Sequence, residues 1–413
     1  MKDSVIMVVA GGLTSTFNYL YLIAMGVLLT PEQYGILFGL VSMLTIITLF
    51  PRSLNLIITR QTSNLLGRGK TNAIYHFWRS SLNRAILVGV LTFVILSALS
   101  LPISWFLHID NVFYPVILFS GILLAFGLQV NWGVTRGLQR FLPLGLGIAF
   151  WAFLRFAFGV LLVLLGFGLF GGLIAIPLSY LVAFLLSIFF LRRLAGPRTD
   201  EPRISNLGGY TIFTFLSIFS ITMLTHFDVV LVRHYFSPVD AGIYSGIAVL
   251  GRVVYYAPMG IAGAIFPKTA EAQGTGAQHW PLFLKSMLMV LTIVGALCLI
   301  YALVPDLIFR LLFSDQYKLS GFILLKYASA MALFAMTFLA VNYLLSLGRA
   351  RIAFALSFTL LLQLGLISIY HAELEQVVNV MLICGIVAFT LTIIFLRVTH
   401  SDLVGRRQPA LHT

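Results

Sequence analysis

PLGLGIAFWAFLRFAFGVLLVLLGFGLFGGLIAIPLSYLVAFLLSIFFL, residues 143–191, holds a single charged side chain, Arg155, in 49 residues. About 20 apolar residues suffice to cross the hydrocarbon core of a bilayer as a helix. The stretch is therefore long enough for two crossings, which we expect at 143–166 and 168–191. The sustained polar stretch RRLAGPRTDEPRISN, residues 192–206, follows at once and divides the chain near its middle.

The composition extends this pattern to the whole chain. Hydrophobic residues make up 60% of it, charged residues 9%, and the mean hydropathy is +1.02. Soluble domains are about half apolar and about a quarter charged, so lipid must be the solvent for most of this surface. The sequence predicts an all-α polytopic membrane protein with about twelve spans, at 4–29, 34–58, 82–107, 112–133, 143–166, 168–191, 207–233, 239–265, 281–304, 321–346, 352–370 and 376–396.

The net charge of +13 is distributed over the loops between these runs. Every second loop is basic, whereas the opposite loops carry mostly acids, among them Glu32, Asp110, Asp240 and Glu373. This asymmetry follows the positive-inside rule and does not indicate nucleic-acid binding. We therefore expect a multi-pass protein of the cell membrane, surrounded by membrane lipids, with both termini in the cytoplasm.

The two halves of the chain share an internal repeat. A shift of 207 residues places Pro31 on Pro238, and it aligns further glycines and prolines: Gly35, Gly39, Pro51, Gly67 and Gly69 fall on Gly242, Gly246, Pro258, Gly274 and Gly276. An even number of spans in each half gives a parallel repeat. We expect six-helix bundles at 1–191 and 207–396 around a central cavity, with a cytoplasmic linker at 192–206 and a cytoplasmic tail at 397–413.

The loop between the first two spans resembles a known family. Residues 28–35, LLTPEQYG, and their later copy at 236–244, FSPVDAGIY, are similar to the first loop of polysaccharide transporters of the O-antigen flippase type. These proteins belong to the multidrug, oligosaccharidyl-lipid and polysaccharide exporter superfamily. The resemblance implies a flippase that moves an isoprenoid-diphosphate-linked oligosaccharide to the outer leaflet. It also implies a cationic cavity lined by spans one, two, seven and eight, and twelve spans argue against the lipid II branch.

Ionisable residues within membrane spans usually face a bundle interior or a wet cavity. Thr45, Thr48, Arg52, Asn55 and Thr59 recur every three or four residues and so share one helix face. We expect this face to meet the central cavity, with Thr45, Arg52 and Asn55 among the substrate-binding residues. Arg252 falls on Thr45 under the 207-residue shift. The planar guanidinium groups of Arg52 and Arg252 suit a diphosphate, because each can donate two hydrogen bonds. The alternative for Arg52, roughly 27 Å from the outer helix end, is that it reaches the cytoplasmic surface.

Three further residues have open roles. Asp228, with Thr225 one turn before it, is either a coupling site for H⁺ or Na⁺ or an ion-pair partner of Arg252. Its shifted counterpart in the first span is Tyr21, which lies beside Asn18, a further candidate substrate-binding residue of the cavity. Arg155 either contacts the substrate diphosphate or satisfies helix carbonyl groups, and the sequence does not name its partner.

Other kinds of chemistry find no support in the sequence. Cys298 and Cys384 both lie in apolar runs and suggest neither a disulfide nor a metal site. Gly69-Lys70-Thr71 lacks the other features of a phosphate-binding loop. We expect no cofactor and no enzymatic activity. Each chain supplies both halves of a pathway, so it should act as a monomer. The alternatives are a cation-coupled multidrug exporter of the same fold, with Asp228 as the coupling site, and a membrane-embedded polysaccharide polymerase or ligase.

Overall fold

A computed structural model describes residues 2–192, 209–262, 265, 269, 278–305, 307–308 and 321–405. Residues 193–206 of the predicted linker and 406–413 of the predicted tail lie outside this part. The described residues form helices with no strand among them. These are α1 (Lys2–Leu28), α2 (Pro31–Ile47), α3 (Leu49–Gly67), α4 (Thr71–Ala98), α5 (Ser100–Phe106), α6 (Phe113–Gly137), α7 (Phe141–Leu162), the π-helical turn η1 (Val163–Phe167), α8 (Gly168–Leu191), α9 (Gly209–Tyr235), α10 (Pro238–Tyr256), α12 (Trp280–Leu303), α14 (Gly321–Ser346), α15 (Ile352–Ile369) and α16 (Leu374–Gly405).

The predicted membrane spans coincide with these helices. Within the described residues, nine stretches are long and apolar enough to cross a membrane, and one of them, 141–191, contains both α7 and α8. The helices α1 and α10 match two more predicted spans, so each of the twelve predicted ranges contains a described helix. The prediction of an all-α polytopic membrane protein is confirmed.

The sequence motif at 28–35 is a helix start. Thr30 caps α2 by accepting a hydrogen bond from the Gln33 backbone N–H at 3.4 Å, and Pro31 occupies the first turn. At the start of α10, the Ser237 hydroxyl accepts from the Asp240 N–H at 3.2 Å and donates to the Asp240 carboxylate at 2.6 Å. A hydroxyl cap followed by proline is a strong start signal, since proline fixes φ and lacks the N–H that would go unused there.

Two breaks in the helices follow from local chemistry. Pro51 has no N–H to bond the carbonyl of Ile47, and α2 ends at Ile47 with α3 beginning two residues later. Gly166 and Gly168, with φ of +92° and +50°, reverse the chain between α7 and α8. Glycine adopts these angles without the steric cost that other residues incur. The 49-residue apolar run therefore folds back as two helices.

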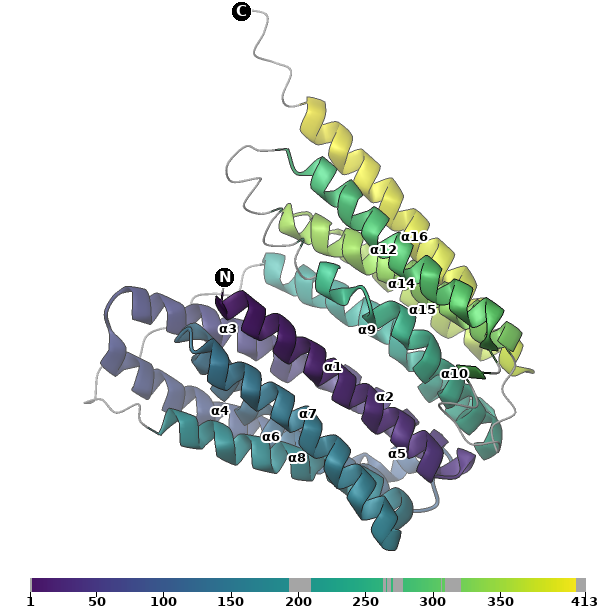
Figure 1. The fold of residues 1–413 in the computed structure, drawn as a ribbon, viewed down its shortest axis with the longest axis horizontal. Coiled ribbons are helices and arrows are strands. Elements are labelled where there is room, and N and C mark those ends of the chain that lie inside the picture. Colours follow the sequence, from purple (N-terminus) through teal and green to yellow (C-terminus); the bar gives the residue numbers. More distant parts are fainter. Residues whose placement is uncertain are drawn as a thin grey trace, which may run out of the picture. The chain divides into compact units, whose positions relative to one another are not determined.

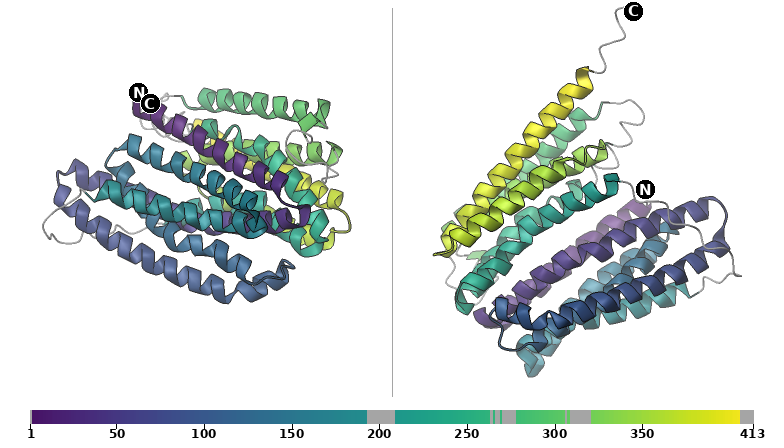
Figure 2. Two further views of the ribbon diagram at one scale, coloured as in Figure 1. Left: turned by 60° about the horizontal axis from the view of Figure 1, so that its bottom comes forward. Right: turned by 180° about the vertical axis from the view of Figure 1, so that it is seen from behind.

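The described chain divides into two compact units (Figures 1 and 2). The first comprises Met1–Asn206 with Ser237–Gly242, and the second Leu207–Phe236 with Ile243–Thr413. In the first unit α1 packs on α7, α7 on α8, and α6 lies against α3, α4 and α8. In the second, α14 packs on α12 and α16, while α15 packs on α9 and α16. Both units are bundles of long helices that run alongside one another (Figure 2).

The helix boundaries themselves repeat along the chain. Adding 207 to the bounds of α1, 2–28, gives 209–235, the bounds of α9. The same shift moves the start of α2, residue 31, onto residue 238, where α10 begins. Near α7 the offset is 211, since 141 plus 211 is 352, the first residue of α15. Residues of the two units can therefore be compared position by position.

Candidate functional site

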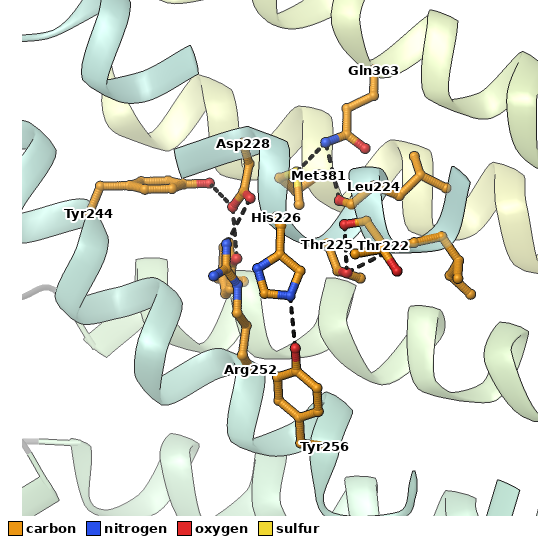
Figure 3. A network of polar contacts seen from close by, with 12 residues as sticks. Thr222, Leu224, Thr225, His226, Asp228, Tyr244, Arg252, Tyr256, Gln363 and Met381 are labelled. Atoms are coloured by element: carbon orange, nitrogen blue, oxygen red, sulfur yellow. Dashed lines mark hydrogen bonds and ion pairs between the residues drawn. The ribbon is translucent and has the colours of Figure 1, made fainter. Parts of the chain in front are cut away.

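The second unit contains a closed polar network around Asp228 (Figure 3). The Nη2 atom of Arg252 lies 3.0 Å from Oδ1 of Asp228, and the two residues are 3% and 0% exposed. The hydroxyls of Tyr244 and Tyr327 donate to Oδ2 of Asp228 at 2.9 and 2.7 Å. Three helices supply the network, because Asp228 lies on α9, Tyr244 and Arg252 on α10, and Tyr327 on α14. Both carboxylate oxygens are thus engaged by donors.

Further polar contacts lie beside this network (Figure 3). Nε2 of His226 lies 2.8 Å from the hydroxyl of Tyr256. The hydroxyl of Thr225 donates to the carbonyls of Ile221 and Thr222 within its own helix, at 2.9 and 3.2 Å. Gln363 on α15 donates to the carbonyl of Leu224 at 3.2 Å. The Thr225 hydroxyl therefore serves its helix backbone, and the charged centre consists of Asp228 and Arg252.

A buried ion pair of this kind fixes helices to one another. Removing one partner leaves an uncompensated charge, which costs about 3–5 kcal/mol in protein interiors. The pair is electrically neutral as a whole, and hydrogen bonds from two tyrosines complete the carboxylate shell. In this arrangement Arg252 has its guanidinium committed to Asp228. The prediction that Arg252 binds the diphosphate remains a prediction.

The first unit contains a different arginine cluster. Nη1 of Arg155 on α7 donates to Oδ1 of Asn18 on α1 at 3.1 Å. The guanidinium carbon lies 4.4 Å from the ring centroid of Tyr21, one helical turn after Asn18. Among the described residues no acidic side chain contacts Arg155, and Glu32 and Asp110, the acids between residues 4 and 191, lie at predicted span ends. Arg155 is thus held by a neutral amide and an aromatic face.

Two kinds of donor in this cluster are left without an acceptor. The Nε and Nη2 atoms of Arg155 are buried and make no hydrogen bond among the described residues. The same is true of Nε1 of Trp151, which lies one helical turn before Arg155 on α7. The Trp151 ring lies 5.2 Å from the ring of Tyr180 on α8, measured between centroids. Buried donors without partners cost about 1–3 kcal/mol each, so their presence calls for an explanation.

Close packing of α1 on α7 positions the Tyr21 ring. A Cβ atom at Gly159 would lie 2.7 Å from Cε2 of Tyr21, so a side chain there would displace the ring. The Tyr21 hydroxyl donates to the carbonyl of Gly172 on α8 at 2.8 Å. The phenol is fully buried, and its hydrogen bond fixes the ring below Arg155.

The polar stripe on α3 separates into two parts. Asn55, Thr59 and Ser63 each donate to a carbonyl 74 residues later, those of Gln129, Gly133 and Gly137 on α6, at 3.0, 3.2 and 3.2 Å. Asn55 also accepts from Nη1 of Arg136 at 2.7 Å. Its side chain therefore links α3 to α6. Arg52 is exposed and Thr45 half-buried, and the Thr45 hydroxyl donates to the carbonyl of Val41.

Comparison with known proteins identifies the family. A family model described as "Polysaccharide biosynthesis protein" matches residues 1–273, about two thirds of the chain. The chain belongs to this polysaccharide biosynthesis family. No curated protein matches it in a direct comparison.

Solved structures similar to this polysaccharide biosynthesis protein are transporters. An inward-facing multidrug resistance MATE family transporter of the MOP superfamily aligns with a TM-score of 0.77 at 15% identity, over 95% of this chain and 96% of that one. An outward-facing MATE transporter aligns at 0.68 and 15% identity, over 98% and 96%. A MOP superfamily transporter from Pyrococcus furiosus aligns at 0.66 and 17% identity, over 95% of each chain. The fold of this family member is that of a MOP superfamily membrane transporter.

The sequence named some members of these clusters and missed others. Asn18, Arg155, Asp228 and Arg252 were singled out as polar residues within apolar runs. Trp151, Tyr244 and Tyr327 were not, because an aromatic residue in a membrane span is usually apolar filler. Tyr244 carried a weak signal, since it precedes Arg252 by eight residues and therefore lies on the same broad side of the helix, about 80° around its axis. Tyr327 lies on α14 of this polysaccharide biosynthesis protein, and its approach to Asp228 depends on tertiary packing.

Proposed function

We propose that this protein is a flippase that carries an isoprenoid-diphosphate-linked oligosaccharide from the cytoplasmic to the outer leaflet for surface polysaccharide synthesis. The protein is a membrane transporter by fold and a polysaccharide biosynthesis protein by family. Polysaccharide synthesis on a lipid carrier needs a transport step, because its charged headgroup and sugars do not cross a bilayer unaided. A transporter of this family fits that step.

The observation that carries the proposal is that, among the described residues of the first unit, two arginines lie without a carboxylate partner. Arg155 sits among a neutral amide and aromatic rings, and Arg52 is exposed on α3. A charged arginine at the centre of a membrane span costs about 2.5–3.5 kcal/mol on insertion scales. An anionic substrate offsets this cost when it binds. Multidrug substrates that are cations would be repelled by the same residues.

In this mechanism the first unit supplies the positively charged arginine side chains that bind the substrate. Alternating access then moves the bound substrate across the membrane. Arg52 lies close to the cytoplasmic end of its span in the predicted topology, where a diphosphate headgroup enters from the inner leaflet. Its guanidinium can bind two phosphate oxygens at once. The second unit contributes a neutral, hydrogen-bonded ion pair that keeps α9, α10 and α14 together. We propose cytoplasmic termini, a cell-membrane location and a monomer as the working unit.

The alternative is a cation-coupled multidrug exporter, which the MATE transporters of similar fold favour. Asp228, a buried acid on α9, would then take up H⁺ or Na⁺. The similar transporter from Pyrococcus furiosus bears on this choice, because its description states that a reversed polarity of the binding pocket suggests a different function. The fold therefore accommodates pockets of different charge, and the charge of the first unit favours an anion.

The test is the location of lipid-linked oligosaccharide in cells that lack the gene. The flippase proposal predicts accumulation on the cytoplasmic leaflet, relieved by the wild-type gene. Export of a cationic dye is measured in the same strains. Normal arrival of the oligosaccharide at the outer leaflet, together with lost dye export, would replace the flippase with the drug exporter.

A further inference from the structure

We propose that Arg155, Trp151 and Asn18 form a binding site for an oxyanion, a carboxylate or a phosphate, of the translocated substrate. This inference rests on the proposed function and specifies where in the first unit the negative charge is bound. The three side chains come from α7 and α1, which pack closely along their length.

The donors of the site are present without their acceptor. A guanidinium carries five N–H donors. Among the described residues Arg155 gives one hydrogen bond, to the neutral Asn18 amide, while Nε and Nη2 are buried and give none. The Nε1 donor of Trp151 is also buried and unused. An oxyanion would accept from these donors at once and would remove the cost of leaving them unmet.

The surroundings favour an anion over a structural role for Arg155. A structural buried arginine is normally matched by a carboxylate, as Arg252 is matched by Asp228 at 3.0 Å. Arg155 has the π face of Tyr21 at 4.4 Å, a weaker partner that leaves the positive charge uncompensated. Arg155 lies about 10 Å before the end of α7 at 1.5 Å per residue, well inside the span.

Aromatic side chains of α1, α7 and α8 lie near these donors in the sequence and the fold. The rings of Trp151 and Tyr180 lie 5.2 Å apart, and those of Phe17 and Phe153 lie 5.3 Å apart on α1 and α7. Ligand pockets combine such apolar faces with a few placed polar groups. Arg155 and Asn18 are half-buried, so a modest rotation of the guanidinium brings its free donors to a ligand at the surface of the unit. Both an acidic sugar and the lipid diphosphate present the required oxygens.

Binding to the purified full chain in detergent tests the site, with tryptophan fluorescence as the readout. The probes are geranylgeranyl diphosphate, trigalacturonic acid and the neutral maltotriose. We expect one of the two anions to bind, and Arg155→Gln to weaken it by about 10- to 100-fold, as loss of a charged hydrogen-bonding group predicts. Trp151→Phe keeps an aromatic ring but removes the indole N–H, and it should weaken binding by about 2- to 10-fold. A thermal shift reads this variant, because the substitution removes one of the five tryptophans that report by fluorescence. Arg79→Gln, an exposed arginine on α4, is the matched control.

The anion that responds identifies the source. If Arg155→Gln weakens binding of geranylgeranyl diphosphate alone, the site binds the lipid headgroup. If it weakens binding of trigalacturonic acid alone, the site binds the glycan. Arg155→Lys keeps the positive charge but loses the planar, two-pronged guanidinium. An anion affinity between those of the wild type and Arg155→Gln supports the site, and Arg155→Lys replaces Arg155→Gln if the latter does not fold. Wild-type affinity in both Arg155 variants, or no anion binding by the wild type, overturns the inference. The flippase proposal itself is judged separately, by the leaflet in which the lipid-linked intermediates accumulate.

Discussion

Tyr21 and Asp228 occupy the same position of equivalent helices, 19 residues after the first residue of α1 and of α9. Each contacts an arginine from another helix of its own unit. Asp228 pairs with Arg252 at 3.0 Å, whereas Tyr21 presents its ring to Arg155 at 4.4 Å. Among the described residues, Arg252 therefore has a carboxylate partner and Arg155 has a neutral amide and an aromatic ring. This difference supports the proposal that Arg155 binds the substrate.

The ion pair of the second unit should behave as a coupled structural element. Asp228→Asn and Arg252→Gln should each lower the stability of the protein by about 3–5 kcal/mol, because each leaves a buried group without its partner. The double variant should lose clearly less than the sum of the two. Unfolding of the purified variants in detergent measures all three. Additive losses would contradict a direct interaction.

The tyrosines that donate to Asp228 should contribute independently of their ring packing. Tyr244→Phe and Tyr327→Phe each remove one hydroxyl bonded to a carboxylate and should cost about 1.5–3 kcal/mol. Tyr370→Phe is the control, since that side chain is 53% exposed. The thermal unfolding midpoints of the three variants provide the comparison. Equal midpoints would mean that the hydroxyls do not stabilise the network.

The Tyr21 ring should depend on the absence of a side chain at Gly159. Gly159→Ala places a methyl group 2.7 Å from the ring, and such overpacking costs about 1–3 kcal/mol. Gly11→Ala on α1 meets no atom within 4 Å and should be neutral or stabilising by about 0.5–1 kcal/mol. Unfolding of both variants is compared with that of the wild type. A tolerated Gly159→Ala would show that α1 can shift away from α7.

The α3–α6 contact should depend on Asn55. Asn55→Ala removes the bonds to the Gln129 carbonyl and to Arg136, which is expected to cost about 1–3 kcal/mol. Ser53→Ala, whose hydroxyl bonds only the Phe50 carbonyl in its own helix, is the control. The decisive comparison is between the loss of stability and the loss of diphosphate affinity in Asn55→Ala, each relative to the wild type. Lost affinity with unchanged stability would return Asn55 to the substrate site.

The sequence was informative about helices and less so about which side chains meet. Apolar runs and the 207-residue repeat predicted every described span, because lipid exposure and helix starts leave local signals. Asn18 and Arg155 were each noticed, but their contact depends on how α1 packs on α7. The stripe containing Asn55 was predicted to face a cavity, and its periodicity was real. Periodicity identifies a polar face without saying whether water, substrate or the carbonyls of α6 satisfy it.

The most direct test of the account is transbilayer movement in proteoliposomes containing the purified protein and a fluorescent isoprenoid-diphosphate-linked oligosaccharide. Access of an added reductant reports how much of the lipid is in the outer leaflet. The account predicts that wild-type protein and Arg79→Gln make nearly all of the labelled lipid accessible, whereas Arg155→Gln and Arg52→Gln slow this by at least about tenfold. Movement no faster than in protein-free vesicles, from a wild-type protein shown to be folded, would contradict the flippase proposal.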